Sequence, residues 1–253
     1  MNILNKKENK LFLILSGFFI ANALIAEFIG IKIFSLENTL GIDSLKYKLF
    51  GEDMCFNLTA GVLLWPVVFV MTDIINEYYG TKGVRFLSYL TVGLISFAFV
   101  AVYASIQLAP ALWWVGSASD SGVPNFQMAF AKIFGQGLWI ILGSLVAFLI
   151  GQIVDVAVFQ RLRKITGDKK VWLRATGSTL VSQFIDSFVV LIIAFKLGAD
   201  WSWALVLAVG FNNYFYKFFV AVVLTPVIYL AHHFIDMYLG QELSDKMKTQ
   251  AGK

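Results

Sequence analysis

Long apolar stretches separated by short polar segments dominate the pattern of the chain. They lie at about residues 11–33, 58–79, 84–108, 135–159, 176–197 and 203–232. Each is about 20 residues or longer, which at about 1.5 Å per residue crosses a hydrocarbon core roughly 30 Å thick. The stretches are continuous, unlike the short alternating segments of a membrane β-barrel. The pattern therefore predicts an all-α, polytopic membrane protein, with six transmembrane helices in one integral-membrane domain over residues 1–253.

The composition agrees with a membrane location. Hydrophobic residues make up 58% of the chain and charged residues 14%, against about 25% charged residues in typical soluble domains. The formal net charge of +4 does not indicate a nucleic-acid partner, because the basic residues gather in particular loops. The chain has no Gly-x-x-x-x-Gly-Lys-Ser/Thr motif. Any pumping would therefore draw on an ion gradient or on a separate subunit.

The distribution of positive charge predicts the orientation of the chain. Fourteen of the twenty Lys and Arg residues fall on one side of the predicted membrane, five fall on the other, and Lys217 lies deep in the last span. The positive-inside rule then places both termini in the cytoplasm, with the basic loop 161–174 as its strongest element. The two halves of three spans would have opposite orientations, which is compatible with an inverted repeat.

Polar residues close the second predicted span at 72–80. Asp73, Asn76 and Glu77 lie within this stretch, and Asp73 and Glu77 share a helix face at a spacing of four residues. A carboxylate near the centre of a bilayer costs about 2.5–3.5 kcal/mol on insertion scales, so such residues normally face a bundle interior. We interpret the stretch as one wall of a binding cavity. The alternative is that both carboxylates lie at the cytoplasmic interface in contact with water.

Two further spans each carry an amide and a carboxylate three residues apart. Gln152 precedes Asp155 in the fourth span, and Gln183 precedes Asp186 in the fifth. The two members of each pair share a helix face. Amides donate and accept hydrogen bonds and carboxylates accept them, which suits recognition of the edge of a planar heterocycle. The alternative is that these side chains pack against neighbouring helices.

Depth in the membrane singles out Asp186 and Lys217. Asp186 is roughly 15 Å into its span and Lys217 roughly 21 Å into the last one, at 1.5 Å per residue, so both lie near the midplane. An unpaired charge there is unfavourable. We therefore expect these side chains to pair, or to be bridged by a substrate or a proton. Tyr216 flanks Lys217, and Glu27 is the best cavity candidate of the first span.

Residues near the predicted interfaces have simpler interpretations. Arg174 is a cytoplasmic anchor, or an inner gate paired with Asp155 or Glu77. His232 and His233 are expected at the interface rather than in a proton relay. Trp113 and Trp114, in the segment 109–134, are expected to anchor the outer surface. The alternative for this tryptophan pair is a lid.

No metal or cofactor site is expected from the sequence. Cys55 is the single cysteine and has no metal-ligand spacing around it.

The polar elements of the spans recur in a known order. They are Thr72-Asp73-x-x-Asn76-Glu77-Tyr78-Tyr79-Gly80, Gly151-Gln152-x-x-Asp155, Arg174-x-x-x-Ser178-x-x-x-Ser182-Gln183-x-x-Asp186 and Tyr216-Lys217. In this combination the chain resembles the queuosine precursor transporter family, also called the vitamin uptake transporter family, over about residues 15–235.

The resemblance implies a multi-pass carrier of the bacterial inner membrane. It would import the 7-deazaguanine bases 7-cyano-7-deazaguanine and 7-aminomethyl-7-deazaguanine, or the base queuine, for salvage into the tRNA nucleoside queuosine. Our mechanistic hypothesis is that Asp186 or Glu77 accepts hydrogen bonds from the N–H edge of the base, while Gln183 and Asn76 read its carbonyl side.

The expected partners are a small-molecule substrate and membrane lipid, without nucleic acid. A homodimer and coupling to protons or sodium are compatible with the sequence. Two other functions stay open at this point. One is the substrate-binding membrane subunit of an energy-coupling-factor transporter, and the other is an intramembrane enzyme. The enzyme is disfavoured because Gly-x-Ser-x-Gly and His-Glu-x-x-His elements are missing from the sequence.

Overall fold

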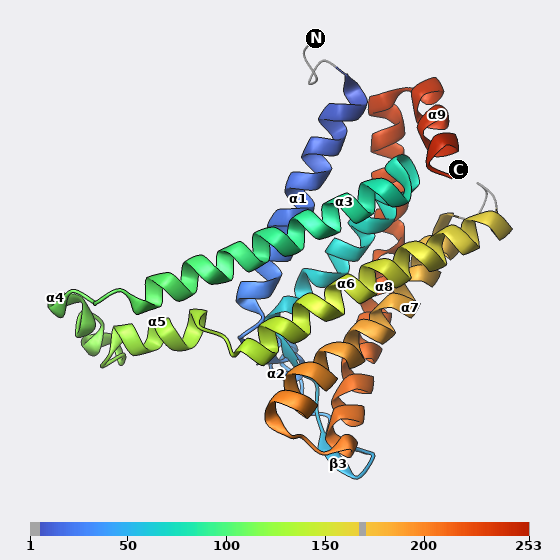
Figure 1. The fold of residues 1–253 in the computed structure, drawn as a ribbon. Helices are drawn as coiled ribbons and strands as arrows, with labels where there is room; N and C mark the ends of the chain where they lie inside the picture. Colours follow the sequence, from blue (N-terminus) through green and yellow to red (C-terminus); the bar gives the residue numbers. More distant parts are fainter. Residues whose placement is uncertain (1–5, 167–170, 253) are drawn as a thin grey trace.

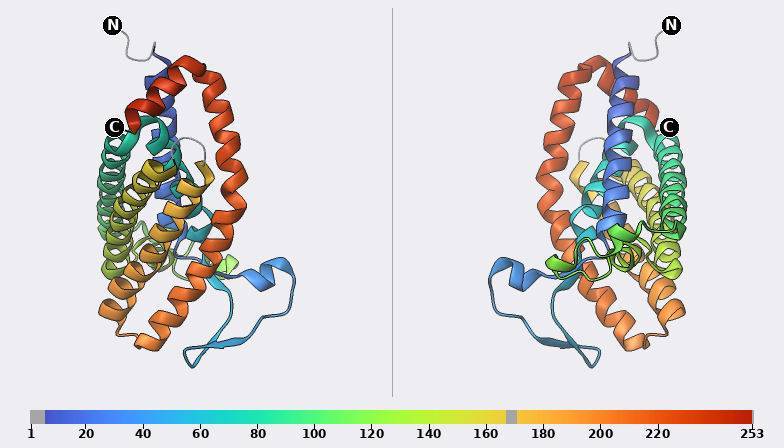
Figure 2. Two further views of the ribbon diagram at one scale, coloured as in Figure 1. Left: turned by 90° about the vertical axis from the view of Figure 1, so that its right-hand side faces the viewer. Right: turned by 90° about the vertical axis from the view of Figure 1, so that its left-hand side faces the viewer.

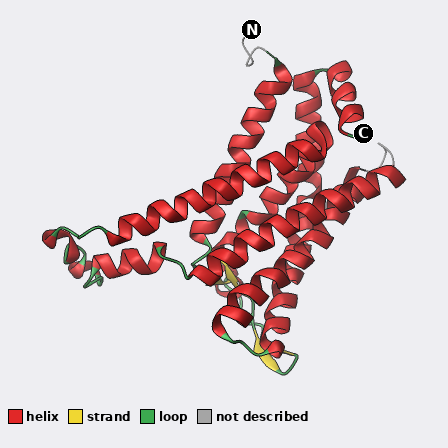
Figure 3. Cartoon of the chain, viewed as in Figure 1, coloured by secondary structure: helices red, strands yellow, loops and turns green. Residues whose placement is uncertain are grey.

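The computed structural model of the protein describes residues 6–166 and 171–252. Lys169 and Lys170 of the basic loop, and Lys253, lie outside the described residues. The described chain is mostly helical (Figures 1 and 3). Its helices are α1 (Lys7–Ile29), α2 (Leu36–Leu40), α3 (Trp65–Gln107), α4 (Leu112–Val115), α5 (Phe126–Phe134), α6 (Leu138–Thr166), α7 (Val171–Leu191), α8 (Trp203–Leu239) and α9 (Gln241–Ala251). The 3₁₀ helices η2 (Ala60–Leu63) and η3 (Ser119–Ser121) and the π-helix η5 (Ile192–Leu197) complete them.

Five helical stretches are long and apolar enough to cross a membrane. They are Lys7–Ile29, Ala60–Gln107, Phe126–Thr166, Trp172–Leu197 and Trp203–Leu239. Helices suit this environment because they satisfy their own backbone hydrogen bonds where no water is available. The all-α polytopic prediction is confirmed at this level.

The difference between five stretches and the six predicted spans lies in α3. This helix has 43 residues, about 65 Å at 1.5 Å per residue, or roughly twice the thickness of a bilayer core. It is broken at Gly80, whose φ of 67° and ψ of −173° are not helical. The leg after the break runs back from the turn toward α4 (Figure 1). The two legs correspond to the second and third predicted spans.

Helix α7 packs between α6 and α8, and α1 packs against α3. Apolar side chains such as Phe18, Phe97 and Phe219 are exposed on the outside of the helices, while many buried positions are polar. This arrangement is the reverse of a soluble protein. It follows from the sequence pattern because lipid solvates the apolar side chains and the helix interior holds the polar ones.

One end of the helical assembly is closed by α9. The start of α1 lies there, since Lys7 Nζ donates to the Tyr238 carbonyl over 2.9 Å and the Tyr79 hydroxyl donates to the Glu8 carbonyl over 2.7 Å. Helix α9 turns back at Gly240 and packs against α3 and α8. We call this the α9 end (Figures 1 and 2). The start of α1 and the whole of α9 therefore lie at the same end of the described chain.

The opposite end carries short strands that the hydrophobic pattern did not predict. Strand β1 (Ile33–Ser35) pairs antiparallel with β4 (Asn57–Thr59), and β2 (Tyr47–Leu49) pairs antiparallel with β3 (Glu52–Met54). Helix α1 runs from Lys7 to Ile29, so the first span is shifted by four residues toward the N-terminus from the predicted 11–33. The second predicted span begins with β4 and the 3₁₀ helix η2 rather than with α-helix. We call this the strand end (Figure 3).

Glu37 holds the segment 35–57 together at the strand end. Its buried carboxylate accepts hydrogen bonds from the Phe56 backbone N–H over 2.8 Å and from the Ser35 hydroxyl over 3.0 Å. The hydrogen bond from Phe56 is the main cause of a lowered pKa for Glu37. A lowered folded-state pKa means that this contact stabilises the segment above the ordinary pKa of glutamate, and that its contribution is lost as the pH falls through the lowered value.

Residues 109–134 extend to the side of the helices (Figure 1). Trp114 packs on Phe126 of α5 with ring centroids 5.1 Å apart, while Trp113 is 78% exposed. The two adjacent tryptophans therefore have different surroundings. The exposed ring of Trp113 suits the interfacial anchoring expected from the sequence.

Replacing Gly80 by Ala is expected to destabilise the α9 end. A Cβ at Gly80 would lie 3.0 Å from the Ala251 carbonyl oxygen, and side chains disfavour this positive φ by about 1–3 kcal/mol. We expect Gly80→Ala to lower the thermal stability of the detergent-solubilised protein and to speed proteolysis of α9. Gly93→Ala is the control on the same helix, because nothing lies within 4 Å of its added methyl group. Equal stability of the two variants would contradict the prediction.

Candidate functional site

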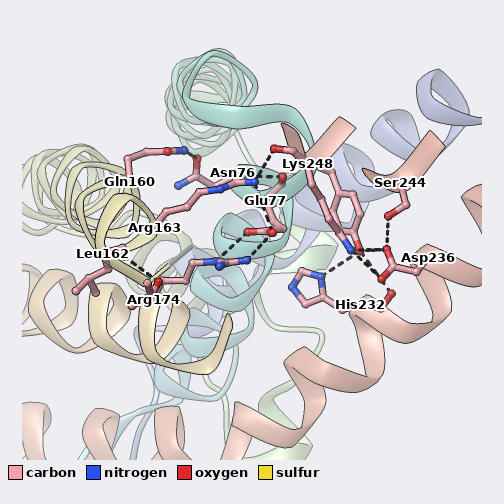
Figure 4. Close-up of polar contacts among 12 residues, drawn as sticks. Asn76, Glu77, Gln160, Leu162, Arg163, Arg174, His232, Asp236, Ser244 and Lys248 are labelled. Carbon is pink, nitrogen blue, oxygen red and sulfur yellow. Dashed lines mark hydrogen bonds and ion pairs between the residues drawn. The ribbon is translucent and has the colours of Figure 1, made fainter. Parts of the chain in front are cut away.

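An ion-pair cluster lies inside the α9 end (Figure 4). Arg174 of α7 binds Glu77 of α3 through two hydrogen bonds, Nη2 to Oε1 over 2.6 Å and Nε to Oε2 over 3.1 Å. Arg163 of α6 adds a second cation, with Nη2 3.7 Å from Glu77 Oε1. All three side chains are buried. Glu77 is thus one of the two partners that the sequence offered for Arg174, and its carboxylate ties α3 to α6 and α7.

A second polar cluster attaches α9 to α8 and α3 (Figure 4). Asp236 accepts hydrogen bonds from the Tyr78 hydroxyl over 2.7 Å, the Ser244 hydroxyl over 2.5 Å and Lys248 Nζ over 2.8 Å. The Tyr78 hydroxyl also lies 3.1 Å from His232 Nδ1. His232 is therefore buried within this cluster. From the sequence, both histidines are expected at the membrane interface. The neighbouring His233 is exposed.

A cavity of about 400 Å³ lies between these two clusters. Its walls come from α3, α7, α8 and α9, and its lining residues are Glu77, Arg174, Tyr229, His232, His233, Asp236, Asp245, Lys248 and Thr249. Ligand pockets in proteins commonly measure about 300–1,000 Å³. The space is therefore large enough for a bicyclic base, and charged groups of both signs line it.

Deeper in the interior, two carboxylates meet between α3, α6 and α7. Asp73 of α3 accepts hydrogen bonds from the Ser178 hydroxyl over 3.1 Å and the Thr179 hydroxyl over 3.0 Å. Asp155 of α6 accepts one from the Ser182 hydroxyl over 2.9 Å. Asp73 is 1% exposed and Asp155 is 0% exposed. Both carboxylates are therefore far removed from solvent.

The amides of this layer are only partly satisfied. Gln152 accepts from the Thr72 hydroxyl over 3.0 Å, and Asn76 accepts from Gln160 over 2.8 Å. The NH₂ groups of Gln152 and Asn76 have no hydrogen-bond partner among the described residues. Gln183 is 2% exposed, and among the described residues neither atom of its amide has a partner. Buried polar groups are nearly always hydrogen-bonded, so Gln183 stands out.

Asp186 and Lys217 pair directly. Lys217 Nζ donates to Asp186 Oδ2 over 2.6 Å and links α7 to α8. A small cavity of about 10 Å³ adjoins this pair, and Lys217, Gln183 and Thr179 are among its lining residues. That volume is about enough for one water molecule. Tyr216 is half-buried beside Lys217. Its hydroxyl makes no hydrogen bond with the other described residues.

Glu27 faces the interior from α1. The Ser144 hydroxyl of α6 donates to its carboxylate, and the Gln136 amide donates to its backbone carbonyl over 3.1 Å. Glu27 is therefore buried, as expected of a cavity candidate, and it connects α1 to α6. Among the described residues, no group of three or more His, Cys, Asp and Glu side chains could hold a metal ion.

The predicted site residues therefore fall into two layers. The ion-pair cluster contains Glu77 and Arg174. The deeper layer contains Asp73, Asp155, Gln152, Gln183, Asp186 and Lys217. Asn76, which accepts from Gln160, lies between the two layers. Sequence reasoning missed Arg163, Asp236 and Lys248. These residues act together only because α9 turns back, and the one local signal of that turn is Gly240, whose φ is 85°.

The fold and this polar interior define a class of protein: a multi-pass helical membrane protein whose buried charges gather around internal cavities. The chain belongs to the family whose model is described as "Putative vitamin uptake transporter", which matches residues 59–231. That range contains most of the residues of both layers.

Curated relatives carry transporter names. The chain is 33% identical over 195 residues to the "Probable queuosine precursor transporter" of Bacillus subtilis, covering 74% of this chain and 76% of the relative. It is 27% identical to the "Queuosine precursor transporter" of Escherichia coli, covering 66% of this chain and 69% of that protein. A protein of Haemophilus influenzae with the same name as the Bacillus relative is also 27% identical, with 72% of each chain covered. No solved structure matches the chain.

Removing one member of the central ion pair is expected to be more harmful than removing both. Glu77→Leu leaves the Arg174 guanidinium buried without its carboxylate, which typically costs about 3–5 kcal/mol, whereas apolar replacement of both partners is often neutral. We expect a large loss of thermal stability in Glu77→Leu and partial recovery in the double variant Glu77→Leu/Arg174→Leu.

The matched control is Glu242→Gln on the exposed face of α9. The measurement is thermal unfolding of each purified variant in the same detergent. A double variant no more stable than Glu77→Leu would show that the two side chains do not depend on each other.

Proposed function

We propose that the protein imports queuosine precursors across the bacterial inner membrane as a solitary carrier. Its substrates are the 7-deazaguanine bases 7-cyano-7-deazaguanine and 7-aminomethyl-7-deazaguanine, or queuine. The two legs of α3 each cross the bilayer, which gives six spans, and the α9 end faces the cytoplasm. The family match, the names of the relatives and the positive charge at the α9 end support this proposal.

The observation that carries the proposal is the unsatisfied amide of Gln183. A buried amide without partners costs roughly 1–3 kcal/mol for each unmade hydrogen bond. A substrate edge with one donor and one acceptor would satisfy both atoms at once. A 7-deazaguanine base presents such an edge, with its ring N–H beside its carbonyl. Gln183 also lies on the same small cavity as Lys217, whose partner Asp186 is one turn further along α7.

The described conformation is closed around this position. The cavity at Gln183 has room for about one water molecule, whereas the cavity at the α9 end has about 400 Å³. We infer that the substrate reaches Gln183 when the helices separate and leaves through the larger cavity. Glu77 is already bound by Arg174, so we assign this pair to an inner gate. Asp186 keeps its proposed role in accepting hydrogen bonds from the base.

The first test is complementation in a cell that can neither synthesise nor import the base. Expression of this chain, with 7-cyano-7-deazaguanine in the medium, is expected to restore queuosine in tRNA, measured by mass spectrometry of the nucleosides. Uptake of the labelled base by proteoliposomes that contain only the purified chain then tests the solitary carrier. Rescue in cells without uptake in proteoliposomes would indicate a partner subunit. Absence of rescue despite membrane expression would overturn the substrate.

Gln183→Ala is expected to reduce uptake at least tenfold while the protein still folds and inserts. Uptake falls because the substrate loses its amide partner, whereas folding loses only the packing of the buried side chain, since the amide has no hydrogen bond to lose among the described residues. Val181→Ala is the control on the same helix, since Val181 is 43% exposed on the lipid side. Normal uptake by Gln183→Ala would remove this residue from the site.

A further inference from the structure

Asp73 and Asp155 form an unusual pair of buried acids. They come from different helices, α3 and α6, and their carboxyl groups face the same turn of α7. The donors around them are hydroxyls of α7: Ser178 and Thr179 donate to the two oxygens of Asp73, and Ser182 donates to Oδ1 of Asp155. The remaining oxygen, Asp155 Oδ2, receives no hydrogen bond from the described residues.

Among the described residues, the two carboxyl groups have no cation beside them that would balance two negative charges. Hydroxyl groups stabilise a carboxylate but carry no charge, so they cannot neutralise two adjacent anions. The charged groups of the surrounding helices are engaged elsewhere: Glu77 of α3 with Arg174 of α7 and Arg163 of α6, Asp186 of α7 with Lys217 of α8, and Glu27 of α1 with the hydroxyl of Ser144. Two carboxyl groups that share a site in this way cannot both ionise, and they titrate as a pair.

We propose that Asp73 and Asp155 hold one exchangeable proton between them, and that this pair couples transport to a proton gradient. A proton on one carboxyl group supplies the missing donor to the other. Asp155 Oδ2, which is fully buried and lacks a donor, marks where a hydrogen bond is missing. The coupling part of this inference rests on the transport function proposed above, whereas the shared proton does not.

The spacing favours a proton over a sodium ion. The three hydroxyl-to-carboxylate distances are 2.9–3.1 Å, which are ordinary hydrogen-bond lengths. A cation between a hydroxyl oxygen and a carboxylate oxygen would hold the two oxygens further apart than these lengths. The adjoining cavity, at Thr179 and Gln183, has room for about one water molecule. Such a water could carry the proton between the pair and the substrate position.

The pair is well placed to affect the substrate position. Ser182, which holds Asp155, is followed directly by Gln183, and Thr179 contacts both Asp73 and the small cavity. Loss of the proton would leave two adjacent anions on α3 and α6, and their repulsion would favour separation of α3 from α6. Protonation would favour the closed packing. The proton and the substrate would therefore act on the same helix contacts.

The shared proton can be tested without any substrate. Infrared difference spectra of the purified full chain, recorded across a pH step, are expected to contain the C=O band of a protonated carboxylic acid. We expect Asp155→Asn and Asp73→Asn each to remove or shift this band. The control Asp200→Asn changes a carboxylate whose side chain is 95% exposed and is expected to leave the band unchanged. Spectra without a band assignable to either aspartate would overturn the proposal.

The coupling is tested in proteoliposomes with labelled 7-cyano-7-deazaguanine. An inward proton gradient is expected to stimulate uptake by the wild type and by Asp200→Asn several-fold. Asp155→Asn is expected to lose this stimulation and to keep exchange of labelled for unlabelled base at equal pH, because exchange moves no net proton. If Asp155→Asn fails to fold, Asp73→Asn takes its place.

The outcomes separate the two proposals. A protonated-acid band in a protein that shows neither uptake nor exchange would keep the shared proton and overturn both the proposed substrate and the coupling. Uptake that is stimulated equally in the wild type and in Asp155→Asn, or that requires a sodium gradient, would overturn the proton coupling and leave the carrier function in place.

Discussion

The fold depends on one constraint: a charge inside a bilayer must be matched by a partner within the protein. Helix α7 shows how the chain meets this constraint. Its Arg174 pairs with Glu77 of α3, its Ser182 bonds Asp155 of α6, and its Asp186 pairs with Lys217 of α8. Apolar side chains cannot specify such contacts, since lipid solvates them as well as a neighbouring helix does. The polar contacts therefore fix which helices pack together.

The two layers of polar residues differ in what they leave unsatisfied. The two polar clusters at the α9 end are closely bonded, with Glu77 held by two arginines and Asp236 by three donors. The deeper layer keeps several unpartnered amide atoms, on Gln183 and Gln152. A protein that only needed stability would fill these positions with apolar side chains. In the carrier proposed above, the Gln183 amide is the position that the substrate would satisfy.

The α9 end combines polar and apolar contacts. Helix α9 is joined to α8 by Gly240, and it is held by hydrogen bonds, an ion pair and the packing of Leu243 and Met247 against apolar side chains of other helices. Gly80, at the turn of α3, touches Ala251 near the end of α9. Displacement of α9 would widen the existing cavity, whereas the strand end is held by backbone pairing and by Glu37. An opening at the α9 end would match the inner gate proposed above for Glu77 and Arg174.

The sequence by itself determined the class of the protein, because long apolar runs and the cost of buried charge can be assessed residue by residue. It also indicated that Asp186 and Lys217 would pair or be bridged, and offered a carboxylate partner as one role for Arg174, since an unpaired charge deep in a bilayer is unfavourable. Only the tertiary structure decided that Asp73 and Asp155 lie together, that α9 folds back to bring Lys248 to Asp236, and that β1 pairs with β4. Those contacts join residues far apart in the chain, and no local spacing encodes the way in which separate helices pack.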